Sequence, residues 1–224
     1  MRQSVKLKIA GIIILIRGET KEFEIPISKG NPEYFRFSNF IYKGQDRPQI
    51  MIDVRVVARL PATNAGSDIF ISNHFDNNEE HWRIKKSRRT FIYRSLLKDA
   101  QTMAFIRNRF SDVRVYLLPW QNKDRIRGIQ DITFNLLEII LINHMAARSL
   151  GIFVHAAGIQ DLFKCAVLFC ARSGGGKSTI ARIWSRNSDA AILNDDRVIL
   201  RREAKGYSIH SSPWTGEFYK YLME

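Results

Sequence analysis

The sequence predicts an α+β or α/β protein in which a β-rich N-terminal domain (residues 1–128) precedes an α/β domain (residues 129–224). Two observations lead to this prediction. Most of the first part consists of short apolar or alternating segments between turn-forming residues, a pattern that is typical of strands. The second part contains an apolar run, a glycine-rich turn and an amphipathic segment in succession, which is typical of a strand that leads into a helix.

Length and composition favour a water-soluble globular protein. The 224 residues, 45% of them hydrophobic, suffice for one large or two small domains with a core. The apolar runs Ile9–Ile16 and Leu136–Asn143 are too short to span a membrane, and the first lacks the cleavage site of a signal peptide. We therefore expect no membrane span. The two cysteines provide no disulfide framework, so we expect a cytoplasmic protein.

The chain is strongly basic, with a net charge of +13 at pH 7. The densest basic segment, RIKKSRRTFIYR from Arg83 to Arg94, contains aromatic residues and so raises the question of nucleic-acid binding. A simpler interpretation is two solvated strands around Lys86–Arg89, and we do not expect nucleic acid as the partner. A positive field attracts an acidic peptide, a phosphorylated substrate or an anionic surface equally well.

In the N-terminal domain we expect a succession of strands between Val5 and Leu118. Turn formers such as Lys43–Gly44 and Pro61 separate them. Asp112–Tyr116 alternates most regularly, so one face of that strand should be exposed to solvent. The expected strands are VKLKIAGIIILI, QIMIDVRVVAR, DIFIS, HWRIKK, TFIYRSL, TMAFI and DVRVYLLP.

A helix that links the two domains is expected next, with Asp131 as its N-cap and Gly151 as its stop signal. The strands IFVHAAGI and KCAVLFCA follow, and the second leads into the glycine-rich turn and another helix. A short strand at AAIL, an acidic turn and a strand hairpin come last.

The glycine-rich turn, ARSGGGKST from Ala171 to Thr179, matches the phosphate-binding (P-loop, or Walker A) pattern G-x-x-x-x-G-K-[ST] except at Ala171. Its glycines permit positive φ angles and let backbone N–H groups point at an anion. In this pattern Lys177 contacts the β- and γ-phosphates of ATP, and the Ser178 hydroxyl binds Mg²⁺. The alternative is an ordinary turn with a solvated lysine. The predicted ATP-binding residues are Arg172, Ser173, Gly174, Gly175, Gly176, Lys177, Ser178 and Thr179.

Two adjacent carboxylates, Asp195 and Asp196, follow AAIL and so should lie at the end of a strand beside the glycine loop. One carboxylate of such a pair can help to hold Mg²⁺, and the other can accept the proton of an attacking hydroxyl. We predict Ser178, Asp195 and Asp196 as the metal-binding residues. The alternative is a tight Asn-Asp-Asp turn without a chemical role.

Four segments together resemble the HPr kinase/phosphorylase superfamily, in particular its HPr-kinase-like members. They are VHAAGI (Val154–Ile159), ARSGGGKST (Ala171–Thr179), LNDDRVIL (Leu193–Leu200) and HSSPWTGE (His210–Glu217). Their order and spacing agree with the family, with 22 residues from His155 to Lys177 and 18 from Lys177 to Asp195. The match covers the last third of the chain.

The resemblance implies a P-loop domain related to ATP-dependent phosphoenolpyruvate carboxykinase, and transfer of the γ-phosphate of ATP to a serine hydroxyl. It implies that Asp195 is the general base, that Asp196 is its acidic companion near Mg²⁺, and that His155 lines the phosphate site. The expected catalytic residues are therefore Asp195, His155 and Lys177. A lone strand histidine such as His155 is also common as a hydrogen-bonded core residue.

The sequence ends at Glu224, soon after the tryptophan motif, whereas family members continue and carry a basic residue that steadies the transferring phosphoryl group. Strand alternation should turn Arg197 away from Asp196, which makes it a poor substitute. The domain therefore looks truncated at its C-terminus: either the protein is longer, or a second subunit of a homo-oligomer supplies the rest.

The sequence thus predicts an ATP- and Mg²⁺-dependent, HPr-kinase-like serine kinase whose substrate is a protein or peptide. A small-molecule kinase and a nucleotide-binding sensor or scaffold without transfer activity are the alternatives. The missing C-terminal part favours the sensor or scaffold, and we expect this chain alone to bind nucleotide and to transfer phosphate poorly.

Overall fold

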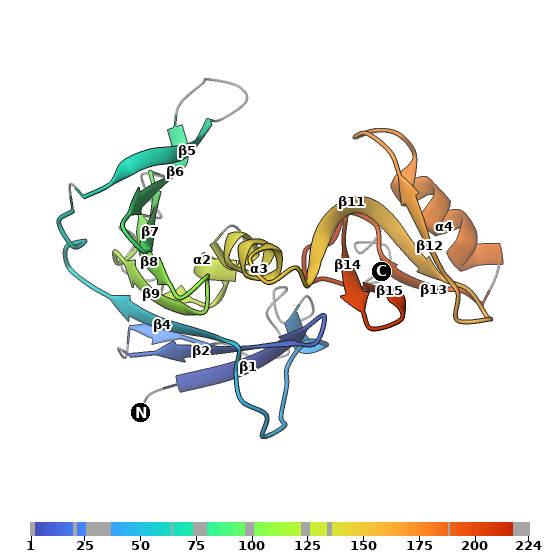
Figure 1. Ribbon diagram of the computed structural model, residues 1–224, viewed down its shortest axis with the longest axis horizontal. Helices are drawn as coiled ribbons and strands as arrows, with labels where there is room; N and C mark the ends of the chain where they lie inside the picture. The colour runs from blue at the N-terminus through green and yellow to red at the C-terminus, as the bar shows by residue number, and fades with distance from the viewer. Residues whose placement is uncertain are drawn as a thin grey trace. The chain divides into compact units, whose positions relative to one another are not determined.

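The computed structural model describes residues 3–19, 22–25, 37–63, 65–73, 80–96, 101–121, 126–133, 136–187 and 189–216 (Figure 1). The chain divides into two compact units. The first consists of Met1–Leu7, Ile12–Tyr34 and Ile41–His144, and the second of Lys8–Gly11, Phe35–Phe40 and Met145–Glu224.

An eight-stranded sheet organises the first unit, in the order β1-β2-β4-β9-β8-β7-β6-β5. β2, β4 and β9 run parallel, and each strand from β9 to β5 is antiparallel to its neighbour. Parallel pairing requires a long crossover, and the hairpins of β5 to β8 form the crossover between β4 and β9. The strands are β1 (Gln3–Ile9), β2 (Ile12–Gly18), β4 (Ile50–Val56), β5 (Ser67–Asn73), β6 (Glu80–Ser87), β7 (Thr90–Ser95), β8 (Thr102–Arg107) and β9 (Asp112–Leu117).

Alternating side chains give this sheet one buried face and one open face. Val54 of β4 and its partner Val115 of β9 are fully buried. The preceding pair, Asp53 and Arg114, belongs to the opposite face, where Arg114 is exposed. The alternation predicted for β9 is confirmed, because Val113, Val115 and Leu117 are fully buried and the residues between them are not.

The apolar segment Val5–Ile16 contains two strands and not the single strand that the sequence predicts. A turn at Ala10 and Gly11 separates β1 from β2, and both residues have positive φ angles, of 47° and 76°. Gly11 adopts this conformation without steric cost, because it has no Cβ atom. The turn is difficult to recognise in the sequence because apolar residues surround it on both sides.

Two helices follow the sheet, α2 (Gln130–Thr133) and α3 (Leu136–Ala146). Asp131 lies inside α2 and not at its N-cap as predicted, and its carboxylate accepts a hydrogen bond from the N–H of Gly128 at 2.8 Å. In α3, Leu136, Leu137, Ile140 and Leu141 are buried. None of the helices in the described ranges has the length and apolar character that crossing a bilayer requires.

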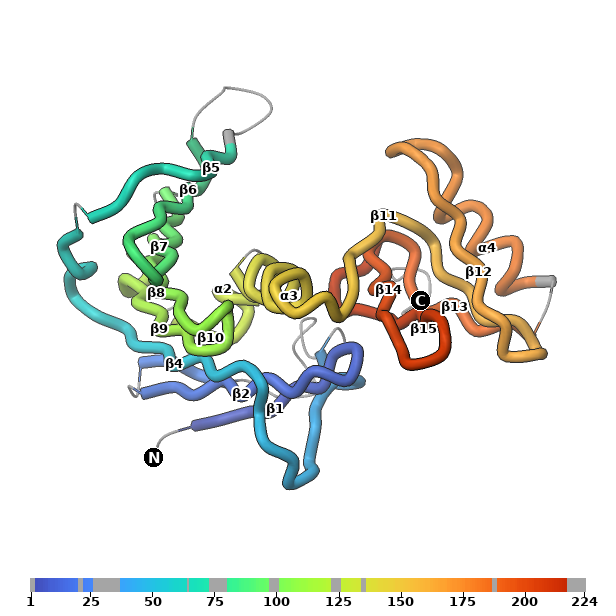
Figure 2. The backbone as a smooth tube through the Cα atoms, in the orientation of Figure 1, coloured from blue at the N-terminus to red at the C-terminus, as the bar shows by residue number. Residues whose placement is uncertain are grey.

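The second unit is built around one long strand, β11 (Gly151–Gln160), whose path Figure 2 shows. Along one edge, β11 pairs first with β14 (Arg197–Glu203) and then with β13 (Ala191–Asn194); along the other edge it pairs with β12 (Ala166–Cys170). β15 (Gly206–His210) pairs with β14. All these pairs are antiparallel, and α4 (Lys177–Asn187) connects β12 to β13.

The predicted α+β or α/β class is wrong, because the described part of the protein is mostly β, with 49% of the described residues in strands and 15% in helices. Its largest sheet is the mixed eight-stranded one, and the second unit is not a P-loop α/β domain of HPr kinase type. The glycine turn with its helix is a local feature, and such a feature does not determine the class of the sheet. Short turns join β14 to β15 and β11 to β12, and short turns produce antiparallel hairpins.

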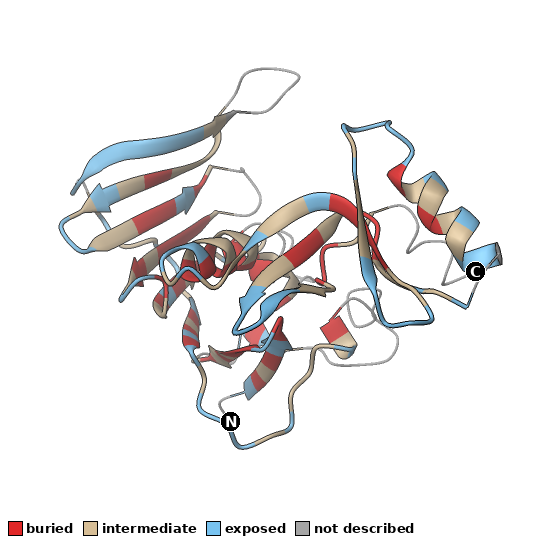
Figure 3. Cartoon of the chain, turned by 45° about the vertical axis from the view of Figure 1, so that its right-hand side comes forward, coloured by how far each residue is buried: buried red, intermediate tan, exposed pale blue. Residues whose placement is uncertain are grey.

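α4 packs on the sheet of the second unit through a small apolar cluster. Ala181 of α4 and Ala157 of β11 are fully buried, and Phe169, Ile180 and Ile192 pack around them. The other side of α4 contains exposed residues, as Figure 3 shows. Alanine at both contact positions lets the helix approach the sheet closely, and this contact fixes where the first turn of α4 lies.

Arg127, in the short strand β10 (Arg127–Gly128) that pairs with β3 (Phe23–Glu24), is a buried cation. Only 2% of the residue is exposed. Its guanidinium lies 4.0 Å from the centroid of the Trp120 ring, and Nε donates to the Leu118 carbonyl at 2.6 Å. Nη1 lies 3.5 Å from the buried carboxylate of Asp131. These interactions together offset the cost of removing the charge from water.

We expect Arg127→Ala to lower the free energy of unfolding by about 3–5 kcal/mol, because the Asp131 carboxylate then stays buried without its cation. Urea unfolding followed by circular dichroism measures the loss. Arg114→Ala removes the same side chain from an exposed position of β9 and should change this free energy by less than about 0.5 kcal/mol. Equal losses in the two variants would contradict the role given to Arg127.

Candidate functional site

The loop between β12 and α4 has the backbone geometry of an anion-binding turn. Gly174 and Gly176 have positive φ angles of 75° and 85°, which residues with a Cβ atom rarely adopt. Among the described residues, no atom comes within 4 Å of a Cβ built on either glycine, so the backbone conformation alone requires glycine there. The loop ends at Lys177, the first residue of α4, where the helix dipole favours negative charge.

Gly175 is required for a different reason, which involves Ala171. A Cβ atom on Gly175 would lie 2.7 Å from the Cβ of Ala171 and 2.9 Å from the carbonyl oxygen of Arg172. The N–H of Gly175 donates to that same carbonyl at 3.0 Å and closes the turn. Alanine at the first position of the pattern is therefore compatible with this turn because residue 175 has no side chain.

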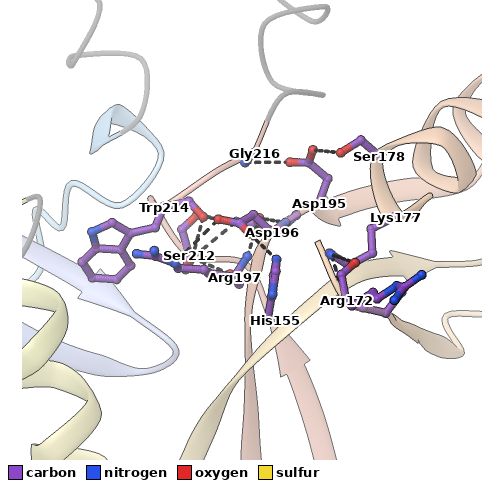
Figure 4. A network of polar contacts seen from close by, with 12 residues as sticks. His155, Arg172, Lys177, Ser178, Asp195, Asp196, Arg197, Ser212, Trp214 and Gly216 are labelled. Atoms are coloured by element: carbon purple, nitrogen blue, oxygen red, sulfur yellow. Dashed lines mark hydrogen bonds and ion pairs between the residues drawn. The ribbon is translucent and has the colours of Figure 1, made fainter. Parts of the chain in front are cut away.

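The Lys177 side chain folds back onto the start of the loop (Figure 4). The residue is 8% exposed, and Nζ donates to the carbonyl oxygens of Ala171 at 3.0 Å and of Arg172 at 3.1 Å. These two carbonyls hold the ammonium group beside the N-terminus of α4. The lysine charge and the helix dipole thus attract an anion to the same place.

Asp195 contacts the first turn of α4 directly. Ser178 Oγ donates to Asp195 Oδ2 at 2.9 Å, and the N–H of Gly216 donates to Oδ1 at 2.8 Å. β13 ends at Asn194, so it delivers the next residue, which is 3% exposed, to this position. A hydroxyl and a carboxylate that meet in this way are both oxygen ligands of the type that Mg²⁺ prefers.

Asp196 points away from Asp195 and toward His155, as Figure 4 shows. Asp196 Oδ1 lies 2.8 Å from His155 Nε2, and Oδ2 lies 3.6 Å from Arg197 Nε. The expectation that Arg197 turns away from Asp196 is therefore wrong. Its premise fails because Asp196 belongs to a turn and β14 begins only at Arg197, so strand alternation does not apply between them.

Asn194, which is not among the predicted site residues, connects the acidic turn to the segment that follows β15. The residue is 4% exposed. Its Nδ2 donates to the carbonyls of Ser212 at 2.9 Å and Trp214 at 3.2 Å, and its Oδ1 accepts from the N–H groups of Asp196 at 2.9 Å and Arg197 at 3.1 Å. The available signal is an asparagine directly before the acidic pair, because asparagine favours turns by bonding to the backbone.

The glycine loop, the acidic turn and His155 line one pocket of about 560 Å³. This size lies within the range of small-molecule sites. Arg172 and Gly175, which the sequence predicts as ATP-binding residues, belong to the loop but not to the lining. Gly216 lines the pocket and was not predicted, although it lies inside the motif HSSPWTGE. The lining residues are His155, Ser173, Gly174, Gly176, Lys177, Ser178, Thr179, Asp195, Asp196 and Gly216.

His210, the first residue of that motif, lies at the end of β15 and not in the pocket lining. Its Nε2 lies 2.8 Å from Ser208 Oγ. Burial lowers the pKa of His210 below its ordinary value, the charge of Arg201 lowers it further, and Glu203 opposes both. The neutral imidazole is therefore favoured. Glu217, the last residue of the motif, lies outside the described residues.

We expect Asn194→Ala to lower the free energy of unfolding by about 2–3 kcal/mol, because buried carbonyl and N–H groups lose their partner. Asn194→Asp should also destabilise the protein, since a carboxylate would face the carbonyl oxygens of Ser212 and Trp214. Urea unfolding is the measurement. Ser185→Ala, on the exposed side of α4, serves as the control and should have an effect below about 0.5 kcal/mol. If both Asn194 variants were as stable as the unaltered protein, the Asn194 hydrogen bonds would not connect the two segments in the way described.

No family model, curated protein or solved structure matches the chain.

Proposed function

We propose that the second unit binds ATP with Mg²⁺ and that the protein is a kinase that transfers the γ-phosphate to a serine hydroxyl of a protein or peptide. One observation carries the proposal: a glycine turn with its lysine, a serine hydroxyl, two carboxylates and a histidine line a single pocket. The order of these groups along the chain resembles that of HPr-kinase-like enzymes. We assign the reaction to the cytoplasm, where the free Cys165 and Cys170 stay reduced.

The loop offers the contacts that a polyphosphate needs. The positive φ angles of Gly174 and Gly176 and the N-terminus of α4 favour backbone N–H donors directed at an anion. Lys177 exchanges its two carbonyl partners for phosphate oxygens, which are charged and therefore stronger acceptors. The loop thus binds the triphosphate so that the terminal phosphoryl group faces the acidic turn.

The residues around Ser178 suit Mg²⁺. Its hydroxyl already meets the Asp195 carboxylate at 2.9 Å. Among the described residues, no group of three or more His, Cys, Asp and Glu side chains is arranged to hold a metal ion. Mg²⁺ is usually held by one or two carboxylates together with substrate phosphates and water. Ser178 and Asp195 would hold it here, and when bound it neutralises charge on the phosphate oxygens.

The contacts favour different roles for the two carboxylates, metal binding and general-base catalysis, and they assign these roles differently from the family resemblance. Asp195, bonded to Ser178, serves the metal. Asp196, paired with His155 at 2.8 Å, accepts the proton of the serine hydroxyl, and His155 orients this carboxylate. The His155 side chain is 53% exposed, so a residue of a large substrate can reach the pair.

Arg197 supplies further positive charge beside the acidic turn. Its Nε lies 3.6 Å from Asp196 Oδ2, and its side chain is 41% exposed. A loose, metaphosphate-like transition state is stabilised by cations in addition to the loop lysine and Mg²⁺. We assign this role to Arg197, in place of the later basic residue that the family resemblance implies.

We expect Lys177→Ala to weaken ATP binding about 10- to 100-fold, because hydrogen bonds from a charged group contribute about 1.5–3 kcal/mol. Calorimetric titration with ATP and Mg²⁺ measures the affinity, and circular dichroism verifies that the variant is folded. Lys205→Ala, at an exposed turn between β14 and β15, is the matched control and should bind ATP like the unaltered protein. An unchanged affinity in Lys177→Ala would exclude phosphate binding by this loop.

Asp195→Asn and Asp196→Asn should respond differently to Mg²⁺. We expect the first to raise the Mg²⁺ concentration needed for half-maximal transfer, with recovery when Mg²⁺ is in excess. The second should slow transfer by about 10²- to 10⁴-fold, the usual cost of losing a general base, with no recovery. Transfer from radiolabelled ATP to a pool of serine-containing peptides provides the rates.

Two outcomes of this comparison would contradict the roles assigned to Asp195 and Asp196. Recovery of Asp196→Asn and not of Asp195→Asn would support the roles implied by the family resemblance. An identical Mg²⁺ response in both variants would show that the two carboxylates act as one unit.

A further inference from the structure

A second concave region lies on the open face of the eight-stranded sheet in the first unit, and it has no part in the nucleotide site. Two hollows of about 280 and 360 Å³ share Thr63, Arg94 and Met103 in their lining, so they adjoin each other. We name them together the basic groove. Its rim carries Arg59, Arg83, Lys85 and Arg94, and its apolar lining is mainly Ile92, Leu96, Met103 and Leu118.

The strand register brings like charges together in the basic groove. Arg83 of β6 lies directly opposite Arg94 of β7, and directly opposed like charges destabilise a sheet. Arg83 forms ion pairs with Glu80 and, at 3.8 Å, with Asp68. Asp68 also lies 4.0 Å from Lys85 Nζ. Acidic side chains of the sheet itself therefore neutralise part of the charge at the β5 side of the groove.

Arg59 and Arg94 have no such acidic partner within the part of the chain that the structure describes. Both residues are exposed, and both line the same hollow. A guanidinium presents its N–H donors in a plane that matches the two oxygens of a carboxylate. Two exposed guanidinium groups in one groove favour a ligand that carries several carboxylates.

The apolar lining of the basic groove distinguishes between two classes of anionic partner. Ile92 and Met103 are 4% and 3% exposed, and Leu96 and Leu118 are half-buried. Among the described residues, none that lines the two hollows is aromatic, whereas single-stranded nucleic acids bind largely by stacking on aromatic side chains. An extended peptide directs alternate side chains to opposite sides, so it can place aliphatic residues on the apolar lining and carboxylates against the rim.

We propose that the basic groove binds an extended acidic segment of a partner protein, in which Asp or Glu residues alternate with aliphatic ones. The binding itself is independent of the nucleotide site. The same partner would also be the phosphoryl acceptor only if the proposed kinase function holds. The binding experiment tests the groove without that assumption.

Fluorescence anisotropy of a labelled peptide that alternates glutamate and valine tests the proposal with the full chain and without nucleotide. We expect binding that weakens at least about tenfold when Arg59→Gln and Arg94→Gln are combined, because the carboxylates lose their charged donors. A peptide with glutamine in place of every glutamate should bind at least about tenfold more weakly for the same reason. Arg202→Gln, an exposed arginine of the second unit, removes one positive charge elsewhere and should bind like the unaltered protein.

Lys177→Ala separates this proposal from the kinase proposal, because it should weaken ATP binding about 10- to 100-fold and leave peptide binding unchanged. Unfolding midpoints of the arginine variants verify that they fold. Failure of the glutamate peptide to bind, or equal binding by the double arginine variant, would overturn the proposal. Tighter binding of single-stranded RNA than of the glutamate peptide, with the same loss in the double variant, would also overturn it and identify the groove as a nucleic-acid site.

Discussion

The buried amide of Asn194 is the interaction on which the candidate site depends. Its nitrogen donates to carbonyls of the segment after β15, and its oxygen accepts from two N–H groups of the acidic turn. One side chain therefore provides hydrogen-bond partners for backbone groups of two segments. Asp195 is then met from two sides, by Ser178 of α4 and by the N–H of Gly216. The helix, the acidic turn and the last described segment are thus joined at a single carboxylate.

The first unit shows that the same residue type can have opposite roles in one sheet protein. Arg127 is almost completely buried, and an aromatic ring, a carbonyl and a carboxylate all contact its guanidinium. These contacts make it part of the packing, since a buried charge persists only when it is compensated. Arg94 lies on the open face beside apolar side chains and directly opposite Arg83. Directly opposed like charges destabilise a sheet, so the two arginines differ in environment and not in chemistry.

The sequence predicted local features, and it also placed Asp195 beside the glycine loop, where Ser178 contacts it. It did not predict how the strands pair. The turn at Gly174–Gly176 follows from local backbone chemistry, as does the alternation of Asp112–Leu117. The fold class depends on which strands pair, and one glycine turn with one helix does not reveal the pairing. The contact between Arg197 and Asp196 was missed because strand alternation was applied to Asp196, which lies in the acidic turn before β14. Asn194 was missed because its donors reach residues that are 18 and 20 positions later in the chain.

β11 changes its partner along one edge at the position of the acidic turn. His155 pairs with Arg197 of β14, Gly158 pairs with Asn194 of β13, and between them the N–H of Ala156 donates to the carbonyl of Asp196 at 3.0 Å. One strand therefore holds both ends of the turn and its middle, whereas residues 172–176 of the glycine loop are exposed. Local opening requires few broken contacts in the loop and many at the turn. The backbone of the glycine loop can thus open more easily than the backbone of the acidic turn, which moves only when its contacts with β11 break.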